Sequence, residues 1–290
     1  MSAPKLSRAR MGTVVTIEVV GHDRSARARR TRELAVERAF AWFDRVESVC
    51  SRFDAGSELR CLCATRGVDV EVSPMLFEAI RFAVAVAEET HGAFDPTVGA
   101  RMEARGFNRD YRDGAVVGSG VSDEEPVSYR EVVLNESARS VRLERALLLD
   151  LGAVAKGLAI DMAVQELRPL ANFVVDAGGD LYCGGHNAAE QPWTVGIRHP
   201  RESHALLTRN LSQVNYSSMQ IESQDCDRYF SDLQSIFSEI FMCDVFHSWL
   251  ELELLNGIPV GNKGNLSVLK QEKYQECHFI HPPFPTYDKK

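Results

Sequence analysis

Residues 147–161, LLLDLGAVAKGLAID, decide the fold class of this chain. The consecutive leucines predict a buried strand that ends on a carboxylate, Asp150, and the residues after it favour a helix. Two glycines, Gly152 and Gly157, flank a single lysine, Lys156, in a region that contains almost no other lysine. Together with the alternation of strands and helices around it, this stretch predicts an α/β or α+β fold with mixed sheets and packed helices.

The periodicity of apolar residues places further elements on both sides of this stretch. Residues 13–20 alternate polar and β-branched apolar residues, which predicts a half-exposed strand. Apolar residues recur every three or four positions from residue 25 to about residue 49, which predicts a long helix. A second helix is predicted to begin with Ser73 as N-cap and Pro74 at its first position, and to end at Gly92.

Several short strands complete the predicted sheets. EVVLN (131–135), SVRLE (140–144) and ALLLD (146–150) are predicted as strands, and the first two are expected to form a hairpin. A helix is predicted over 153–168, where Pro169 ends it. NFVVDAGGD (172–180) and WTVGIR (193–198) are predicted as two more strands.

Composition excludes several classes of protein. The chain has 290 residues, of which 44% are hydrophobic and 26% charged, with a formal net charge of −8. A nucleic-acid or anionic-membrane partner is not expected, because binding either needs a basic face. No apolar run reaches the roughly 18 residues of a transmembrane segment. The N-terminus lacks the apolar region of a secretory signal, so we expect a cytoplasmic protein, and the odd number of cysteines, seven, predicts reduced thiols.

Amino-acid usage changes abruptly near residue 205. Residues 1–204 contain 24 Arg, 2 Lys and 27 Ala, whereas residues 205–290 contain 2 Arg, 5 Lys and one Ala. A domain boundary, a chimera, an alternative exon or a reading-frame error could each produce this change. We predict a core over 1–207 and a divergent segment over 208–290, whose Pro-rich tail (280–290) we expect to be disordered.

Three bends of the chain carry glycines next to carboxylates. Asp150 ends a predicted strand, and the helix that follows offers free N–H groups, while Lys156 adds a cation suited to phosphate. The alternative is a plain strand–turn–helix connection, with Asp150 as a helix cap and Lys156 in solvent. In GAFDPTVGA (92–100), Phe94 could contact an aromatic ring and Asp95 a ribose hydroxyl or base edge, or Asp95 could cap the next turn.

The third bend, DAGGD (176–180), could line a pyrophosphate–metal site or form a simple tight turn. Each of these three bends is weak evidence by itself. Taken together, three bends with glycines and carboxylates predict a nucleotide held with Mg²⁺, a cation that prefers oxygen ligands.

The motifs and their order resemble the FAD:protein FMN transferase family, also called ApbE-like. They are MGTVVTIEV, SRFDAGSEL, VSPMLFEAI, HGAFDPTVG, LDLGAVAKGLAIDMAVQEL, VVDAGGDLYCGG and PWTVGIRHPR, and they span roughly residues 10–207. The resemblance implies a T-fold-like architecture with FAD in a cleft. It also implies Mg²⁺-dependent transfer of FMN from FAD to a Ser or Thr hydroxyl of a partner protein, with release of AMP.

The resemblance also assigns site residues. FAD contacts are implied at seven positions, namely Met11, Phe53, Ala93, Phe94, Asp95, Asp150 and Lys156, and a backbone carbonyl ligand of Mg²⁺ is implied at Ala153. Phosphoryl transfer depends mainly on positioning and charge neutralisation, which suits a divalent cation and a lysine at a pyrophosphate.

Beyond residue 207 the sequence departs from the family pattern. The expected TSGxYxR-like segment, the HxxDPxTG segment and the late Asp-Ala-x-x-Thr helix, which carries two metal ligands, are absent from this sequence. Two hypotheses follow: a transferase whose activity is impaired by this loss, or a non-catalytic, truncated or chimeric FAD-binding protein. The acceptor protein, the general base and the oligomeric state do not follow from the sequence.

Overall fold

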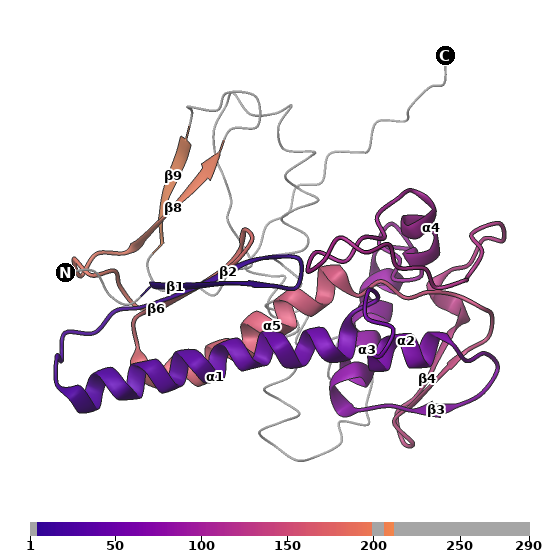
Figure 1. Ribbon diagram of the computed structural model, residues 1–290, viewed down its shortest axis with the longest axis horizontal. Coiled ribbons are helices and arrows are strands. Elements are labelled where there is room, and N and C mark those ends of the chain that lie inside the picture. The colour runs from indigo at the N-terminus through magenta and orange to yellow at the C-terminus, as the bar shows by residue number, and fades with distance from the viewer. Residues whose placement is uncertain (1–4, 199–205, 212–290) are drawn as a thin grey trace. The chain divides into compact units, whose positions relative to one another are not determined.

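The first sheet joins the start of the chain to a segment far along it. A computed structural model describes residues 5–198 and 206–211 (Figure 1). The sheet has the order β1-β2-β6-β7, and all its pairings are antiparallel. Its strands are β1 (Lys5–Arg10), β2 (Thr13–Val19), β6 (Phe173–Ala177) and β7 (Asp180–Gly184). The tight turn between β1 and β2 therefore lies beside the turn between β6 and β7, where the DAGGD bend is located.

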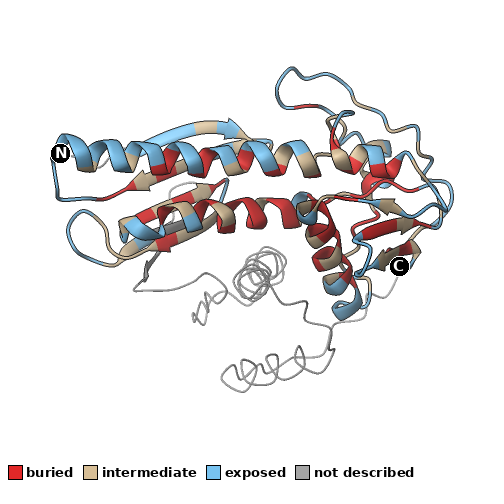
Figure 2. Ribbon diagram, turned by 90° about the horizontal axis from the view of Figure 1, so that it is seen from below, coloured by how far each residue is buried: buried red, intermediate tan, exposed pale blue. Residues whose placement is uncertain are grey.

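Two helices pack lengthwise against each other beside this sheet (Figure 1). They are α1 (Ala26–Cys50) and α5 (Gly152–Leu167). Buried residues follow one side of α1, whereas α5 is apolar on most of its circumference and is mostly buried (Figure 2). Both helices carry small buried residues, such as Ala39 in α1 and Ala159 in α5, and small side chains allow helices to pack closely.

A second sheet and three shorter helices form the other part of the body. The sheet has the order β3-β5-β4 and is antiparallel, with β3 (Val70–Glu71), β4 (Val132–Asn135) and β5 (Ser140–Leu143). The helices are α2 (Glu58–Cys63), α3 (Pro74–Glu89) and α4 (Gly99–Ala104). Ser73 caps α3 by accepting the N–H of Leu76 at 3.2 Å, as predicted.

The strands β8 (Trp193–Arg198) and β9 (Leu206–Leu211) form an antiparallel hairpin. The predicted segment 208–290 and its tail 280–290 lie outside the described residues, apart from 208–211 in β9. The boundary at residue 207 stays a prediction. Within the described part of the chain, no helix combines the length and the apolar character that crossing a bilayer requires.

Most predicted elements are confirmed, and the α+β class with them, but three details are wrong. The sheets are antiparallel rather than mixed, and the one parallel pairing in the described residues is an isolated bridge between Val98 and Leu148. The segment 146–150 is not a sheet strand, because its backbone bonds a loop: the Gly99 N–H donates to the Leu148 carbonyl at 3.1 Å. Helix α3 ends at Glu89, and Gly92, with φ of 83°, follows in the exit turn.

Candidate functional site

Asp150 lies where the buried leucine segment turns into α5. Its backbone N–H donates to the Pro96 carbonyl at 2.7 Å, which joins this bend to the GAFDPTVGA loop. One carboxylate oxygen accepts the N–H of Gly152, the first residue of α5, at 2.9 Å, although the N-cap position itself is Leu151 rather than Asp150. The other oxygen accepts Nε–H of Arg52 at 2.6 Å. The carboxylate is therefore fixed from two sides, and a contact of Asp150 with FAD stays a prediction.

Lys156 connects the same bend to the DAGGD turn. It lies one turn into α5, and its Nζ is 2.5 Å from Oδ2 of Asp180, the first residue of β7. Gly178 and Gly179 shape this turn with φ of 72° and 104°, a region that favours glycine. A Cβ on Gly178 would lie 2.0 Å from Oγ1 of Thr13 in β2. The three predicted bends therefore adjoin one another in the fold, with the α5 segment in the middle.

Glu47, near the end of α1, joins two further walls of the site. Its Oε2 accepts the Met11 N–H and the Tyr111 hydroxyl, each at 3.1 Å. Met11 has φ of 51°, because it forms the tight β1–β2 turn with Gly12. Burial, and then the hydrogen bond to the Glu47 carboxylate, raise the pKa of Tyr111. Tyr111 is therefore a neutral hydrogen-bonding group at physiological pH.

These side chains surround one cavity of about 420 Å³. Four of the predicted site residues, which come from three separate segments, line it: Met11, Phe53, Asp150 and Lys156. The other lining residues are Gly12, Glu47, Cys50, Ser51, Arg52, Arg109, Asp110, Tyr111, Arg112, Gly152 and Ala155. A cavity of this size with several polar groups and an aromatic ring is typical of a site for an organic ligand.

The remaining predicted residues do not line this cavity in the part of the chain that the structure describes. Asp95 shapes its own loop and ties it to a distant segment: Oδ1 accepts the N–H and hydroxyl of Thr97, and Oδ2 accepts the Tyr129 N–H at 3.1 Å. Ala93 and Phe94 belong to the same loop, and Ala153 lies in the first turn of α5. The capping alternative for Asp95 is therefore observed, while contacts of these residues with FAD stay predictions.

The described residues do not by themselves fit a magnesium ion. No group of three or more His, Cys, Asp or Glu side chains within 5–198 and 206–211 is placed to hold a metal. The three carboxylates at the cavity already accept N–H or O–H donors: Glu47 as above, Asp150 from Arg52, and Asp110 from Arg112 at 2.6 Å. The Arg112 hydrogen bonds hold the pKa of Asp110 below its usual range.

Cys50, which also lines the cavity, is not a nucleophile at neutral pH. Burial raises the pKa of its thiol to about 12, and the nearby Glu58 carboxylate contributes to that rise. Because the thiolate is the reactive form, this thiol stays protonated and inert.

Sequence reasoning missed Glu47, Arg52 and Tyr111. Arg52 and Phe53 are neighbours in the motif SRFDAGSEL, so the motif itself was found, but its arginine was not singled out. The partner of Arg52 is 98 positions away in the sequence, and that of Tyr111 is 64 positions away. Patterns in neighbouring residues do not predict contacts between residues this far apart in the sequence.

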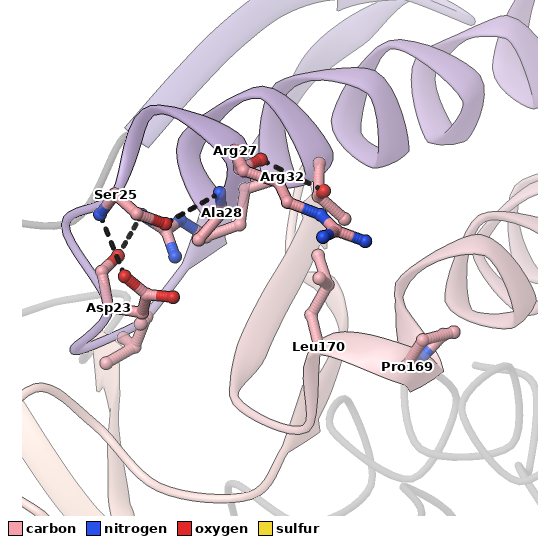
Figure 3. Close-up of a pocket in the computed structure, with 10 residues that line it drawn as sticks. Asp23, Ser25, Arg27, Ala28, Arg32, Pro169 and Leu170 are labelled. Atoms are coloured by element: carbon pink, nitrogen blue, oxygen red, sulfur yellow. Dashed lines mark hydrogen bonds between the residues drawn. The ribbon is translucent and has the colours of Figure 1, made fainter.

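A second cavity lies at the start of α1, as Figure 3 shows. Its volume is about 350 Å³, and Asp23, Ser25, Arg27, Arg32 and Pro169 are among its lining residues. Ser25 accepts the Ala28 N–H at 3.2 Å, and Nη2 of Arg32 donates to the Asp23 carbonyl at 2.8 Å. None of the predicted site residues lines this cavity.

The fold and the first cavity define a class of protein: an α+β body with a pocket that offers a lysine, an aromatic ring and a fixed carboxylate. Comparison with protein families makes the assignment specific. The ApbE family model matches residues 11–241, so the chain belongs to the ApbE family. The match extends past residue 207, where the motif resemblance ends.

Individual relatives agree with this assignment. The chain is 34% identical to the FAD:protein FMN transferase of Rhodobacter capsulatus over 154 residues, which are 51% of this chain and 29% of that protein. It is 33% identical to the FAD:protein FMN transferase of Treponema pallidum over 183 residues, which are 57% of this chain and 51% of that protein. The chain thus spans about half the length, or less, of these two curated relatives.

A solved structure shares the fold. The crystal structure of the ApbE protein from Thermotoga maritima matches with a TM-score of 0.60 and 29% sequence identity, over 73% of this chain and 68% of that chain. The predicted ApbE architecture is therefore confirmed for the described residues.

Proposed function

We propose that this chain is an FAD:protein FMN transferase. The observation that carries the proposal is the cavity of about 420 Å³, around which Met11, Phe53, Asp150 and Lys156 meet from three separate segments. The proposal is further supported by the names of two relatives in the same family, which are FAD:protein FMN transferases.

The proposed reaction moves the FMN half of FAD onto a partner protein. A Ser or Thr hydroxyl oxygen of the acceptor bonds to the phosphorus of the FMN half, and the bond from that phosphorus to the bridging oxygen breaks. AMP leaves with the bridging oxygen, and the hydroxyl proton passes to a base that the described residues do not identify. Lys156 would neutralise charge on the pyrophosphate, and the bend at Asp150 would orient the dinucleotide.

Magnesium belongs to this proposal through the family resemblance, with the carbonyl of Ala153 as one ligand. When bound, it would supply charge neutralisation at the pyrophosphate. Because the described carboxylates at the cavity are engaged by other donors, the metal is assigned no step here.

A cytoplasmic location and an acceptor protein with a Ser or Thr target also remain proposals. Three described cysteines, Cys50, Cys61 and Cys63, carry free thiols, in keeping with a reducing compartment.

The sequence favours one alternative, a protein that binds FAD without transferring FMN, because the expected motifs after residue 207 are missing. One experiment separates the two functions. The chain is incubated with FAD, Mg²⁺ and a flavin-acceptor domain, and the mass of the acceptor and the release of AMP are followed. We expect slow flavinylation that stops when the acceptor hydroxyl is removed. FAD binding without any flavinylation or AMP would support the alternative, and absence of FAD binding would contradict both.

A further inference from the structure

Arg52 has an unusual environment for an arginine. It follows Ser51, the C-cap of α1, lines the cavity, and is only 5% exposed. Arginines are almost never this buried unless they are paired, because removing a charge from water is costly. Its burial therefore calls for specific partners.

The side chain of Arg52 contacts two residues that line the cavity, Asp150 and Phe53, and the carbonyl of Phe107, which precedes the lining residues 109–112. Nε–H donates to Oδ2 of Asp150 at 2.6 Å, and Nη2–H donates to the Phe107 carbonyl at 2.7 Å. The guanidinium carbon also lies 4.0 Å from the centre of the Phe53 ring. A planar guanidinium can donate both hydrogen bonds and lie against the ring at the same time, whereas a lysine ammonium cannot reproduce this geometry. Arg52 thus fixes a carboxylate, a loop and an aromatic ring relative to one another.

The arrangement is not optimal for stability. Nη1 of Arg52 is buried and has no hydrogen-bond partner among the described residues. A buried donor without a partner is destabilising, and well-packed apolar residues in place of a buried ion pair are often neutral or stabilising. Packing alone therefore does not explain why an arginine occupies this position, whereas positioning of Asp150 and Phe53 does.

We propose that Arg52 is a positioning residue for the nucleotide site, acting through the Asp150 carboxylate and the Phe53 ring. This inference rests on the proposed function, since it takes the ligand of the cavity to be FAD. It adds a residue that the family resemblance does not assign, and it predicts that the contribution of Arg52 to binding depends on Asp150.

A double-mutant cycle tests the proposal on the full chain. FAD affinity is measured by flavin fluorescence titration for the unaltered chain, Arg52→Lys, Asp150→Asn and the double variant, with thermal unfolding of each recorded in parallel. We expect Arg52→Lys to weaken FAD binding about ten- to a hundredfold. We expect the loss of affinity in the double variant to be clearly smaller than the two single losses combined, because Arg52 acts in large part through Asp150. Arg52→Gln, which retains donors but no charge, replaces Arg52→Lys if the lysine variant does not fold.

Arg60→Lys is the matched control. Arg60 is also largely buried, and its Nη1 donates to the Arg52 carbonyl at 2.8 Å, but it does not line the cavity. We expect this variant to lower the unfolding temperature while FAD affinity stays within about threefold, since its contacts are structural. Unchanged FAD affinity in Arg52→Lys, or additive losses in the double variant, would overturn the positioning role and leave the proposed function standing. Failure of the unaltered chain to bind FAD would overturn both.

Discussion

At the scale of single residues, Lys156 allows the clearest separation of a binding role from a structural one. Its ammonium group is 2.5 Å from the Asp180 carboxylate, and both side chains are partly exposed. In the structural role, Lys156 would serve only to tie α5 to the β6–β7 turn. In the binding role, the same ammonium would also contact the pyrophosphate of FAD.

Two substitutions distinguish these roles. Lys156→Met is expected to weaken FAD binding by at least about tenfold, because it removes a charged hydrogen-bond donor from the cavity. Asp180→Asn is expected to leave FAD binding nearly unchanged, because it removes the ion pair but retains the lysine. Flavin fluorescence titration of both variants provides the measurement. Equal losses in the two variants would show that Lys156 acts only through Asp180.

The sequence pointed to residues that line the cavity where a motif coincided with it, and it missed lining residues whose contacts are distant in the sequence. Asp150 and Lys156 stood out because a charged pair amid glycines and leucines is locally unusual, and both line the cavity. Asp95 stood out in the same way, yet its oxygens accept hydrogen bonds from Thr97 in its own loop and from the distant Tyr129 N–H, and it does not line the cavity. The sequence around Arg52 does not indicate that it is buried at the cavity, because its environment depends on Asp150, far away in the sequence.

At the scale of elements, the site depends on the contact between the leucine segment and the GAFDPTVGA loop. The Gly99 N–H bonds the Leu148 carbonyl, and the Asp150 N–H bonds the Pro96 carbonyl. A Cβ on Gly99 would lie 2.5 Å from the Leu148 carbonyl oxygen, a distance that real Cβ contacts do not reach. The glycine therefore lets the two segments approach, and this approach sets the position of Asp150.

Gly99→Ala should push these segments apart. We expect it to lower the free energy of unfolding by about 1–3 kcal/mol through overpacking, and to weaken FAD binding as Asp150 shifts. Gly118→Ala is the control, because a Cβ there would meet nothing within 4 Å, so its effect should stay within about 0.5 kcal/mol. Urea unfolding and flavin titration of both variants are the measurements. A Gly99→Ala variant as stable as Gly118→Ala would contradict the close-contact explanation.

The elements also show why some strands were predictable and others were not. The hairpin of β4 and β5 was predicted because both strands carry β-branched and apolar residues. Strand β1, KLSRAR, was missed because it is a charged edge strand, with Arg8 paired to Glu37 of α1. The leucine run at 147–149 is fully buried, as predicted, but its backbone partner is a loop rather than a strand. The spacing of apolar residues predicts which residues are buried, but it does not predict which segment their backbone pairs with.

At the scale of the whole molecule, two buried thiols give the fold a predictable dependence on alkaline pH. Burial raises the pKa of Cys50 from 9.0 to about 12 and that of Cys63 to about 11. Because both pKa values are higher in the folded state, the unfolded chain ionises first as the pH rises. The stability that these thiols contribute is fully present below about pH 9 and is lost between pH 9 and pH 12.

The variant Cys50→Ala/Cys63→Ala lacks both titrating groups. Its free energy of unfolding is expected to be lower than that of the unaltered chain at pH 8, because two buried sulfur atoms are lost. The difference between the two proteins should shrink at pH 10.5, where only the unaltered chain has lost stability by thiol ionisation. Urea unfolding at the two pH values measures this difference. A difference that is constant or grows with pH would contradict the assigned burial of these thiols.

The central claim is that one cavity, lined by Met11, Phe53, Asp150 and Lys156, holds the flavin dinucleotide. A crystal structure of the full chain with FAD tests this claim most directly. We predict density for FAD in that cavity, with the pyrophosphate within reach of Lys156. FAD bound instead in the cavity at the start of α1, or elsewhere on the molecule, would contradict the claim.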